Sequence, residues 1–80
     1  MTPQEIFDYK LKWKMNEPYK VIVHSDKEHE GKDWCKEQVE PHKWDFVKWY
    51  NMYENIYLFE DKASADRFEQ AMGRWVTKEE

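Results

Sequence analysis

The residues that could do chemistry are few, and three suitable types stand together as His24, Ser25 and Asp26. A hydrolase triad uses the same types, but its groups must converge in space, and neighbours along a strand point to opposite faces. Ser25 and Asp26 are better explained as capping residues, since Glu28 stands three positions after Ser25 and completes a capping box. We therefore predict no catalytic residues and no enzyme activity.

The sequence also lacks the residue patterns that typically bind metal ions or phosphate groups. The soft metal ligands are His24, His29, Cys35 and His42. Structural zinc sites combine Cys-x2–4-Cys with His-x3–5-His, and no such combination is present. Cys35 falls on the apolar stripe of an expected helix, which favours a small buried hydrophobe over a nucleophile. The two glycines form no phosphate loop. We predict no metal site and no cofactor.

Composition indicates one domain, residues 1–80, with a polar surface and a bulky core. Aromatic residues make up 18% of the chain and charged residues 38%. Each buried aromatic removes ~150–250 Å² from water, which compensates for the small size of the domain. The 13 basic and 17 acidic residues give a net charge of −4, which argues against binding to phosphate backbones. The run Lys10, Lys12 and Lys14 is interpreted as a solvated face.

The expected location is the cytosol. A single cysteine excludes an internal disulfide and favours a reducing compartment. The first residues, Met1 to Glu5, do not begin a signal peptide, and no stretch approaches the ~20 apolar residues of a membrane span. We expect no contact with a membrane.

The N-terminal segment satisfies two patterns. Thr2, Pro3 and Glu5 form a helix start with a capping box, whereas residues 7–15 alternate between apolar and polar as a strand does. We expect a helix, with an edge strand as the alternative. As a helix, the segment carries two apolar stripes, Ile6/Tyr9/Trp13 and Phe7/Leu11/Met15.

The remaining elements follow the order β-α-β-β-α. Strands are expected at Tyr19–His24, Trp44–Tyr53 and Ile56–Phe59, with helices from Ser25 to before Pro41 and from Asp61 to Gly73. Glu54-Asn55 is the expected two-residue hairpin turn. This order predicts an α+β domain of ferredoxin-like type, with a three-stranded sheet in the order 1-3-2 and both helices on one face. Gly31 inside a helix predicts close contact of that backbone with the sheet.

The predicted hairpin gives the sheet two apolar faces, because cross-strand partners share a face. The face under the helices then holds Val21, Val23, Phe46, Tyr50, Met52, Tyr57 and Phe59. The outer face holds Ile22, Val47, Trp49, Tyr53, Ile56 and Leu58. A solvated sheet face is normally polar, so something is expected to cover the outer one.

Three kinds of cover are considered for the outer face. The N-terminal helix could lie over it with Ile6, Tyr9 and Trp13. A protein partner or a second copy could bind it, since contiguous apolar patches mark interaction sites. Trp49 and Tyr53 could instead stack bases, although few basic residues lie near them in the sequence.

Two resemblances extend this interpretation. The segment from Phe59 to Phe68 resembles the junction of the third strand and second helix in RNA-recognition motifs. The base-stacking positions of that family hold Glu54 and Ile56 here, so we attribute the match to the packing of a capped helix over a sheet. More of the chain is similar to short uncharacterised open reading frames of tailed bacteriophages. The matching segments are Pro18-Tyr19, Val21–Asp26, Gly31–Cys35, Trp44, Tyr53-Glu54 and Phe59–Asp61.

The phage resemblance implies an accessory protein in the host cytoplasm. We expect it to bind and modulate a host macromolecule, a protein rather than nucleic acid, or to self-associate. The expected contact residues lie on the outer face: Val47, Trp49, Tyr53, Ile56 and Leu58. The alternatives are a single-stranded nucleic-acid binder that uses the aromatic sheet residues and a small enzyme of unrecognised type.

Overall fold

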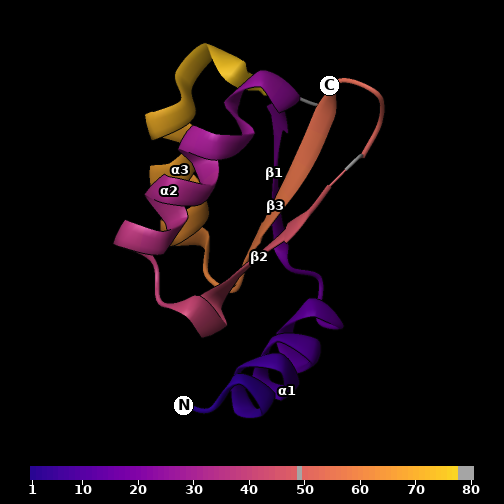
Figure 1. The fold of residues 1–80 in the computed structure, drawn as a ribbon, viewed down its shortest axis with the longest axis vertical. Coiled ribbons are helices and arrows are strands. Elements are labelled where there is room, and N and C mark those ends of the chain that lie inside the picture. The colour runs from indigo at the N-terminus through magenta and orange to yellow at the C-terminus, as the bar shows by residue number, and fades with distance from the viewer. Residues whose placement is uncertain (49, 78–80) are drawn as a thin grey trace.

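Four antiparallel strands form the sheet of the described residues, 1–48 and 50–77, in this computed structural model (Figure 1). The strands are β1 (Tyr19–His24), β2 (Trp44–Val47), β3 (Glu54–Phe59) and β4 (Val76–Thr77), arranged in the order β2-β3-β1-β4. The helices are α1 (Pro3–Lys14), α2 (Glu28–Gln38) and α3 (Lys62–Met72), and the 3₁₀ turns are η1 (Ser25–Lys27), η2 (Pro41–Lys43) and η3 (Gly73–Trp75). The predicted α+β architecture is confirmed.

The predicted count of three strands is wrong, because the chain returns after α3 and adds β4 to the edge of β1. Val76 pairs with Val23, and Thr77 pairs with Ile22. Gly73, with a φ of 56°, ends α3 and turns the chain, in agreement with its predicted position at the end of this helix. A strand of two residues carries no alternation that a sequence pattern could reveal.

The N-terminal segment is a helix, so the alternative of an edge strand is wrong. The Thr2 hydroxyl oxygen accepts the N–H of Glu5 at 3.2 Å, and the Glu5 carboxylate accepts the N–H of Thr2 at 3.3 Å. These bonds satisfy N–H groups that every helix start leaves open. The apolar residues at alternate positions divide between two sides of the helix. Trp13 is buried, whereas Phe7 is exposed.

The predicted hairpin turn at Glu54-Asn55 is wrong. Both residues belong to β3, where Glu54 lies opposite His24 and Asn55 opposite Val23. Strand β2 ends at Val47, which lies opposite Ile56. The described residues between the two strands, 48 and 50–53, are called the β2–β3 loop below. The aromatic residues of this segment have high β-propensity, which is why the sequence favoured a longer strand.

The error in register leaves the predicted faces of the strand residues unchanged. Ile56 was expected opposite Tyr53 and lies opposite Val47, six positions earlier in the chain. Side chains alternate with a period of two, so a shift by an even number of residues keeps each one on its face. The pairs Phe46–Tyr57 and Val21–Tyr57 accordingly lie on the predicted inner face.

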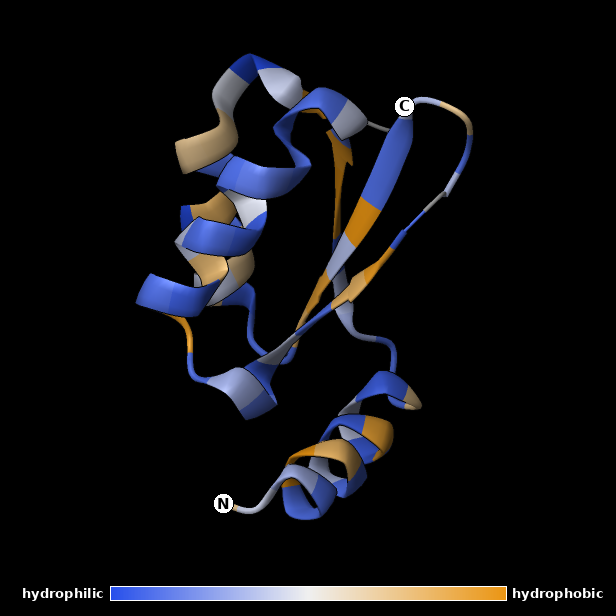
Figure 2. Ribbon diagram, viewed as in Figure 1, coloured by the Kyte–Doolittle hydropathy of each residue, from blue (hydrophilic) through white to orange (hydrophobic). Residues whose placement is uncertain are grey.

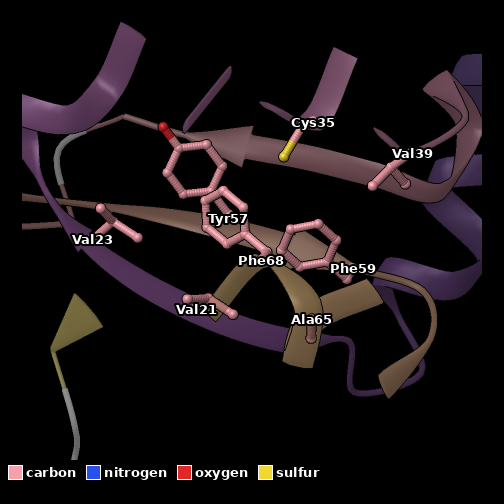
Figure 3. Packing of buried hydrophobic residues seen from close by; sticks show 8 residues of the cluster. All are labelled: Val21, Val23, Cys35, Val39, Tyr57, Phe59, Ala65 and Phe68. Atoms are coloured by element: carbon pink, nitrogen blue, oxygen red, sulfur yellow. The ribbon is translucent and has the colours of Figure 1, made fainter. Parts of the chain in front are cut away.

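The core lies between this inner face and helices α2 and α3 (Figure 3). Its buried members are Val21, Val23, Cys35, Val39, Tyr57, Phe59, Ala65 and Phe68, with Trp34 and the predicted inner-face residue Phe46 packed against them. The Tyr57 hydroxyl donates a hydrogen bond to the Glu28 carbonyl at 2.9 Å. A Cβ on Gly31 would lie 2.5 Å from that hydroxyl oxygen, so the predicted contact of Gly31 with the sheet is confirmed.

Helix α1 packs at one end of the sheet, against η2 and the start of β2 (Figure 1). The Trp13 indole N–H donates to the His42 carbonyl at 2.8 Å, and the Tyr9 hydroxyl donates to the Glu60 carboxylate at 2.8 Å. The Lys14 ammonium lies 2.6 Å from the Asp45 carboxylate, which Lys10 also approaches at 3.9 Å. These hydrogen bonds and ion pairs anchor α1 to η2, to β2 and to the residue that follows β3.

The ion pairs of α1 predict a loss of stability in acid. Burial alone would raise the pKa of Asp45, but hydrogen bonds from the Lys14 ammonium and the Phe46 N–H, together with the charge of Lys10, outweigh it and lower that pKa. Folding therefore favours the ionised carboxylate. Its contribution is present above the ordinary Asp pKa of about 4 and is lost as the pH falls through the lowered value.

We expect Asp45→Asn to lower the free energy of unfolding by about 1 kcal/mol at neutral pH, because it removes the ionised partner of Lys14. The variant should also lose less stability than the wild type when the pH drops below about 4. Urea denaturation over a pH series measures both effects. A wild-type and variant pair with parallel pH profiles would contradict the assignment.

Candidate partner-binding surface

The β2–β3 loop is held in shape by Asn51. Its side-chain oxygen accepts the Tyr53 N–H at 2.9 Å, and its amide nitrogen donates to the Glu54 carboxylate at 2.6 Å. The Tyr53 carbonyl accepts the Ser25 N–H at 2.7 Å, which ties the loop to the end of β1. A turn is stabilised when an Asn side-chain oxygen accepts a hydrogen bond from the backbone N–H two residues later in the chain. The loop is therefore anchored by polar groups at its base.

The same loop exposes large side chains to solvent. Tyr50 is 48% exposed, Met52 75% and Tyr53 64%. Tyrosine and methionine are enriched in the contact regions of protein interfaces, where tyrosine supplies a large area for few rotatable bonds. An anchored loop that presents such side chains has the features of a recognition element.

The outer sheet face continues from this loop. Tyr50 lines a hollow of about 260 Å³ together with Ile22, Ile56, Lys20 and Thr77. Its lining is mixed: the buried Ile22 and the half-buried Ile56 lie beside the polar side chains of Lys20, Glu69 and Thr77. Tyr50 had been expected on the inner face, and this prediction is wrong because the residue lies in the loop. The loop itself thus covers part of the outer face.

Helix α1 reaches the outer face at its other end. Leu58, which lies opposite Asp45, is buried, and an open hollow beside it is lined by Lys14, Met15 and Pro18. The N-terminal helix therefore covers the Leu58 end, while Val47 stays exposed near the loop.

The predicted contact residues fall into three groups. Val47, Ile56 and Leu58 are in strands and share the outer face by register. Tyr53 is in the loop and not in a strand, and Trp49 lies outside the described residues. Sequence reasoning placed Met52 on the inner face, whereas the structure leaves it exposed in the loop. The signal that could have found the loop is Asn51, a turn-forming residue inside an aromatic run.

The charged groups beside the loop are partly acidic. The Lys48 ammonium lies 3.7 Å from the Glu28 carboxylate, which Lys32 also approaches at 3.5 Å. Hydrogen bonds from the Thr77 hydroxyl and the Asn51 amide lower the pKa of Glu54, so this carboxylate is ionised at neutral pH. Carboxylates next to the aromatic side chains disfavour a nucleic-acid backbone at this position.

The catalytic candidates have structural roles. The predicted capping box of Ser25 and Glu28 is wrong, because Ser25 begins η1 and helix α2 begins only at Glu28. The His24 side chain caps that turn, with Nδ1 accepting the Asp26 N–H at 3.1 Å. Cys35 is fully buried, as predicted, and burial raises the pKa of its thiol to about 12. Such a thiol stays protonated and lacks the nucleophilic form.

Within residues 1–48 and 50–77, no three side chains of His, Cys, Asp or Glu converge as a metal site would require. None of the helices described is both long and apolar enough to span a bilayer.

The chain matches no family model, and neither the curated proteins nor the solved structures contain a significant match to it.

Proposed function

We propose that this protein is a small binding module that recognises a partner protein through the β2–β3 loop and the adjoining outer face. The observation that carries the proposal is an anchored loop with Tyr50, Met52 and Tyr53 exposed, of which Tyr50 also lines the hollow beside Ile22 and Ile56. Aromatic side chains of this kind dominate binding energy at protein interfaces when they enter pockets of the partner. The exposed strand residue Val47 extends the surface along β2.

A protein partner fits this surface better than single-stranded nucleic acid. Base stacking uses exposed aromatic rings, which Tyr50 and Tyr53 would supply, but it is normally combined with a basic groove that follows the phosphates. Here the Glu28 carboxylate lies beside Lys48, and the Glu54 carboxylate lies at the base of the loop, so the charges around the two tyrosines do not form a basic groove. The test described below therefore distinguishes a protein partner from nucleic acid.

We further propose that the domain is a variant of the ferredoxin-like plan. The strand order β2-β3-β1-β4 and the position of α2 and α3 on one face of the sheet support this assignment (Figure 1). Helix α1 and the two-residue length of β4 are the departures from that plan. The similarity to phage reading frames supports a role as an accessory protein that modulates a host protein in the host cytoplasm.

The test is a capture experiment with a matched pair of variants. Tagged wild-type protein, Tyr50→Ser/Tyr53→Ser and Tyr19→Ser are each incubated with lysate from the cells in which the protein acts. Tyr19 is 45% exposed at the start of β1, outside the proposed surface. We expect the double variant to lose a captured protein that Tyr19→Ser retains, with an affinity loss of about 30-fold or more, equivalent to ~2 kcal/mol.

Two results would contradict the proposal. One is equal capture of the same protein by the double variant, with circular dichroism showing that all three proteins are folded. The other is capture that nuclease treatment abolishes and that weakens steeply with salt, because this behaviour indicates phosphate contacts.

A further inference from the structure

Helix α1 carries a second apolar stripe that the fold leaves uncovered. Phe7, Leu11 and Met15 follow one another at intervals of four residues and are 57%, 42% and 83% exposed. Figure 2 shows hydrophobic segments along α1 and places this helix at the end of the molecule away from α2 and α3. The buried Trp13 lies on the opposite side of the helix. These three residues are called the outer stripe, and they extend over about 12 Å of the helix.

We propose that the outer stripe is the contact surface of a homodimer, in which α1 packs antiparallel against α1 of a second copy. In the symmetric arrangement the two Leu11 side chains meet at the twofold axis. Phe7 of each copy then packs against Met15 of the other, because these residues are equally distant from Leu11. The same patch serves both copies, as a twofold interface requires.

Charge complementarity supports a second copy and the antiparallel direction. Asp8 and Lys12 lie on the same flank of the outer stripe, ~60° and ~100° round the helix from Leu11. Lys12 forms no ion pair among the described residues, and Asp8 receives a hydrogen bond from Gln4. Antiparallel packing places Asp8 of each copy beside Lys12 of the other. Two reciprocal ion pairs result.

The other flank explains why the parallel direction is disfavoured. It carries Lys10 and Lys14, which are already held by Asp45 of their own chain. Parallel packing would set Asp8 of one copy beside Lys10 of the other and Lys12 beside Lys14, which brings like charges together. Antiparallel packing places Lys10 and Lys14 of the two copies on the same side, where Asp45 of each chain offsets part of their charge. The antiparallel arrangement uses the charges that the fold has left available.

The position of the stripe leaves the candidate binding surface open. Helix α1 and the β2–β3 loop lie at opposite ends of the long axis of the molecule, which measures 34 Å (Figure 1). A dimer through α1 therefore leaves the β2–β3 loop of each copy accessible. Because three side chains per copy form a small interface, we expect a weak dimer, with a Kd of roughly 10–100 µM.

Sedimentation velocity over a range of protein concentrations tests the dimer without reference to any partner. We expect a shift from monomer to dimer in the wild type, and at least a 100-fold weaker association in Leu11→Asp, where two carboxylates would meet at the axis. Ala63→Asp introduces the same charge at an exposed position of α3 and should leave the shift unchanged. A wild-type protein that stays monomeric at roughly ten times the upper limit of that Kd range would overturn the proposal.

A charge-exchange pair tests the antiparallel register. Asp8→Lys and Lys12→Asp should each weaken self-association about tenfold, because each sets like charges side by side. Mixed together, they should form a heterodimer, in which every new charge faces its opposite. Equal association of the two variants alone and in the mixture would contradict the register, even if the wild type dimerises.

Discussion

Replacing Phe68 with Ala is expected to lower the free energy of unfolding by about 3–5 kcal/mol. Phe68 is fully buried on α3, and its ring centre lies 4.6 Å from that of Tyr57, 5.2 Å from Phe59 and 5.3 Å from Trp34. The truncation removes one ring from this cluster and leaves a cavity between α3 and the sheet. Small domains have a total stability of roughly 5–15 kcal/mol, so a large part of it would be lost.

Urea denaturation followed by far-ultraviolet circular dichroism measures this loss. Phe7→Ala is the matched control, since the same truncation is made at an exposed position of α1 and should cost less than about 0.5 kcal/mol. The measurement is made at low protein concentration, where the proposed dimer is dissociated. Similar losses in the two variants would show that Phe68 is not at the centre of the core.

Replacing Gly31 with Ala is expected to destabilise the protein by about 1–3 kcal/mol, against the direction of helix propensity. In an exposed helix interior, Gly to Ala stabilises by ~1 kcal/mol. Here the added Cβ would lie 2.5 Å from the hydroxyl oxygen of Tyr57 and 2.7 Å from the ring carbon that carries it. Tyr57 is buried and its hydroxyl is hydrogen-bonded to the Glu28 carbonyl, so the ring has little freedom to move.

A double-mutant cycle identifies the cause of that loss. In a Tyr57→Leu background the shorter side chain no longer reaches Gly31, and Gly31→Ala should then be neutral or stabilising. The free energies come from urea denaturation of the four proteins. The same destabilisation in both backgrounds would mean that contact with Tyr57 is not the reason for a glycine at this position.

The parts of the fold that the sequence predicts well are those controlled by local hydrogen bonds. Thr2 with Glu5 begins α1 and Asp61 begins α3, where its carboxylate accepts the Ser64 N–H at 2.9 Å. Gly73 ends α3 in the left-handed φ range that glycine favours. The faces of β1 and β3 are also predicted correctly, because alternation depends on the period of two and not on the position of the turn.

The parts that the sequence does not predict depend on contacts between distant residues. The position of the loop depends on the Tyr53 carbonyl, which accepts the N–H of Ser25, 28 residues earlier in the chain, whereas the aromatic run around Asn51 favours a strand. The position of α1 depends on Trp13 reaching the His42 carbonyl, 29 residues away. The residues of the proposed contact surface are consequently placed in part: Val47 and Ile56 lie on the expected face, but Tyr53 is in the loop and Tyr50 lies beside the outer face.

The most direct test of the partner-binding surface is site-specific photo-cross-linking in the cell. A benzoyl-phenylalanine side chain is placed at Tyr53 in one protein and at the exposed Tyr19 in another, so that both substitutions keep an aromatic ring. Because Tyr53 projects from an anchored loop, we predict a discrete protein adduct on irradiation from this position, identifiable by mass spectrometry, and none of that mass from Tyr19. An adduct that forms only from Tyr19, or equally from both positions, would contradict a binding surface centred on the β2–β3 loop.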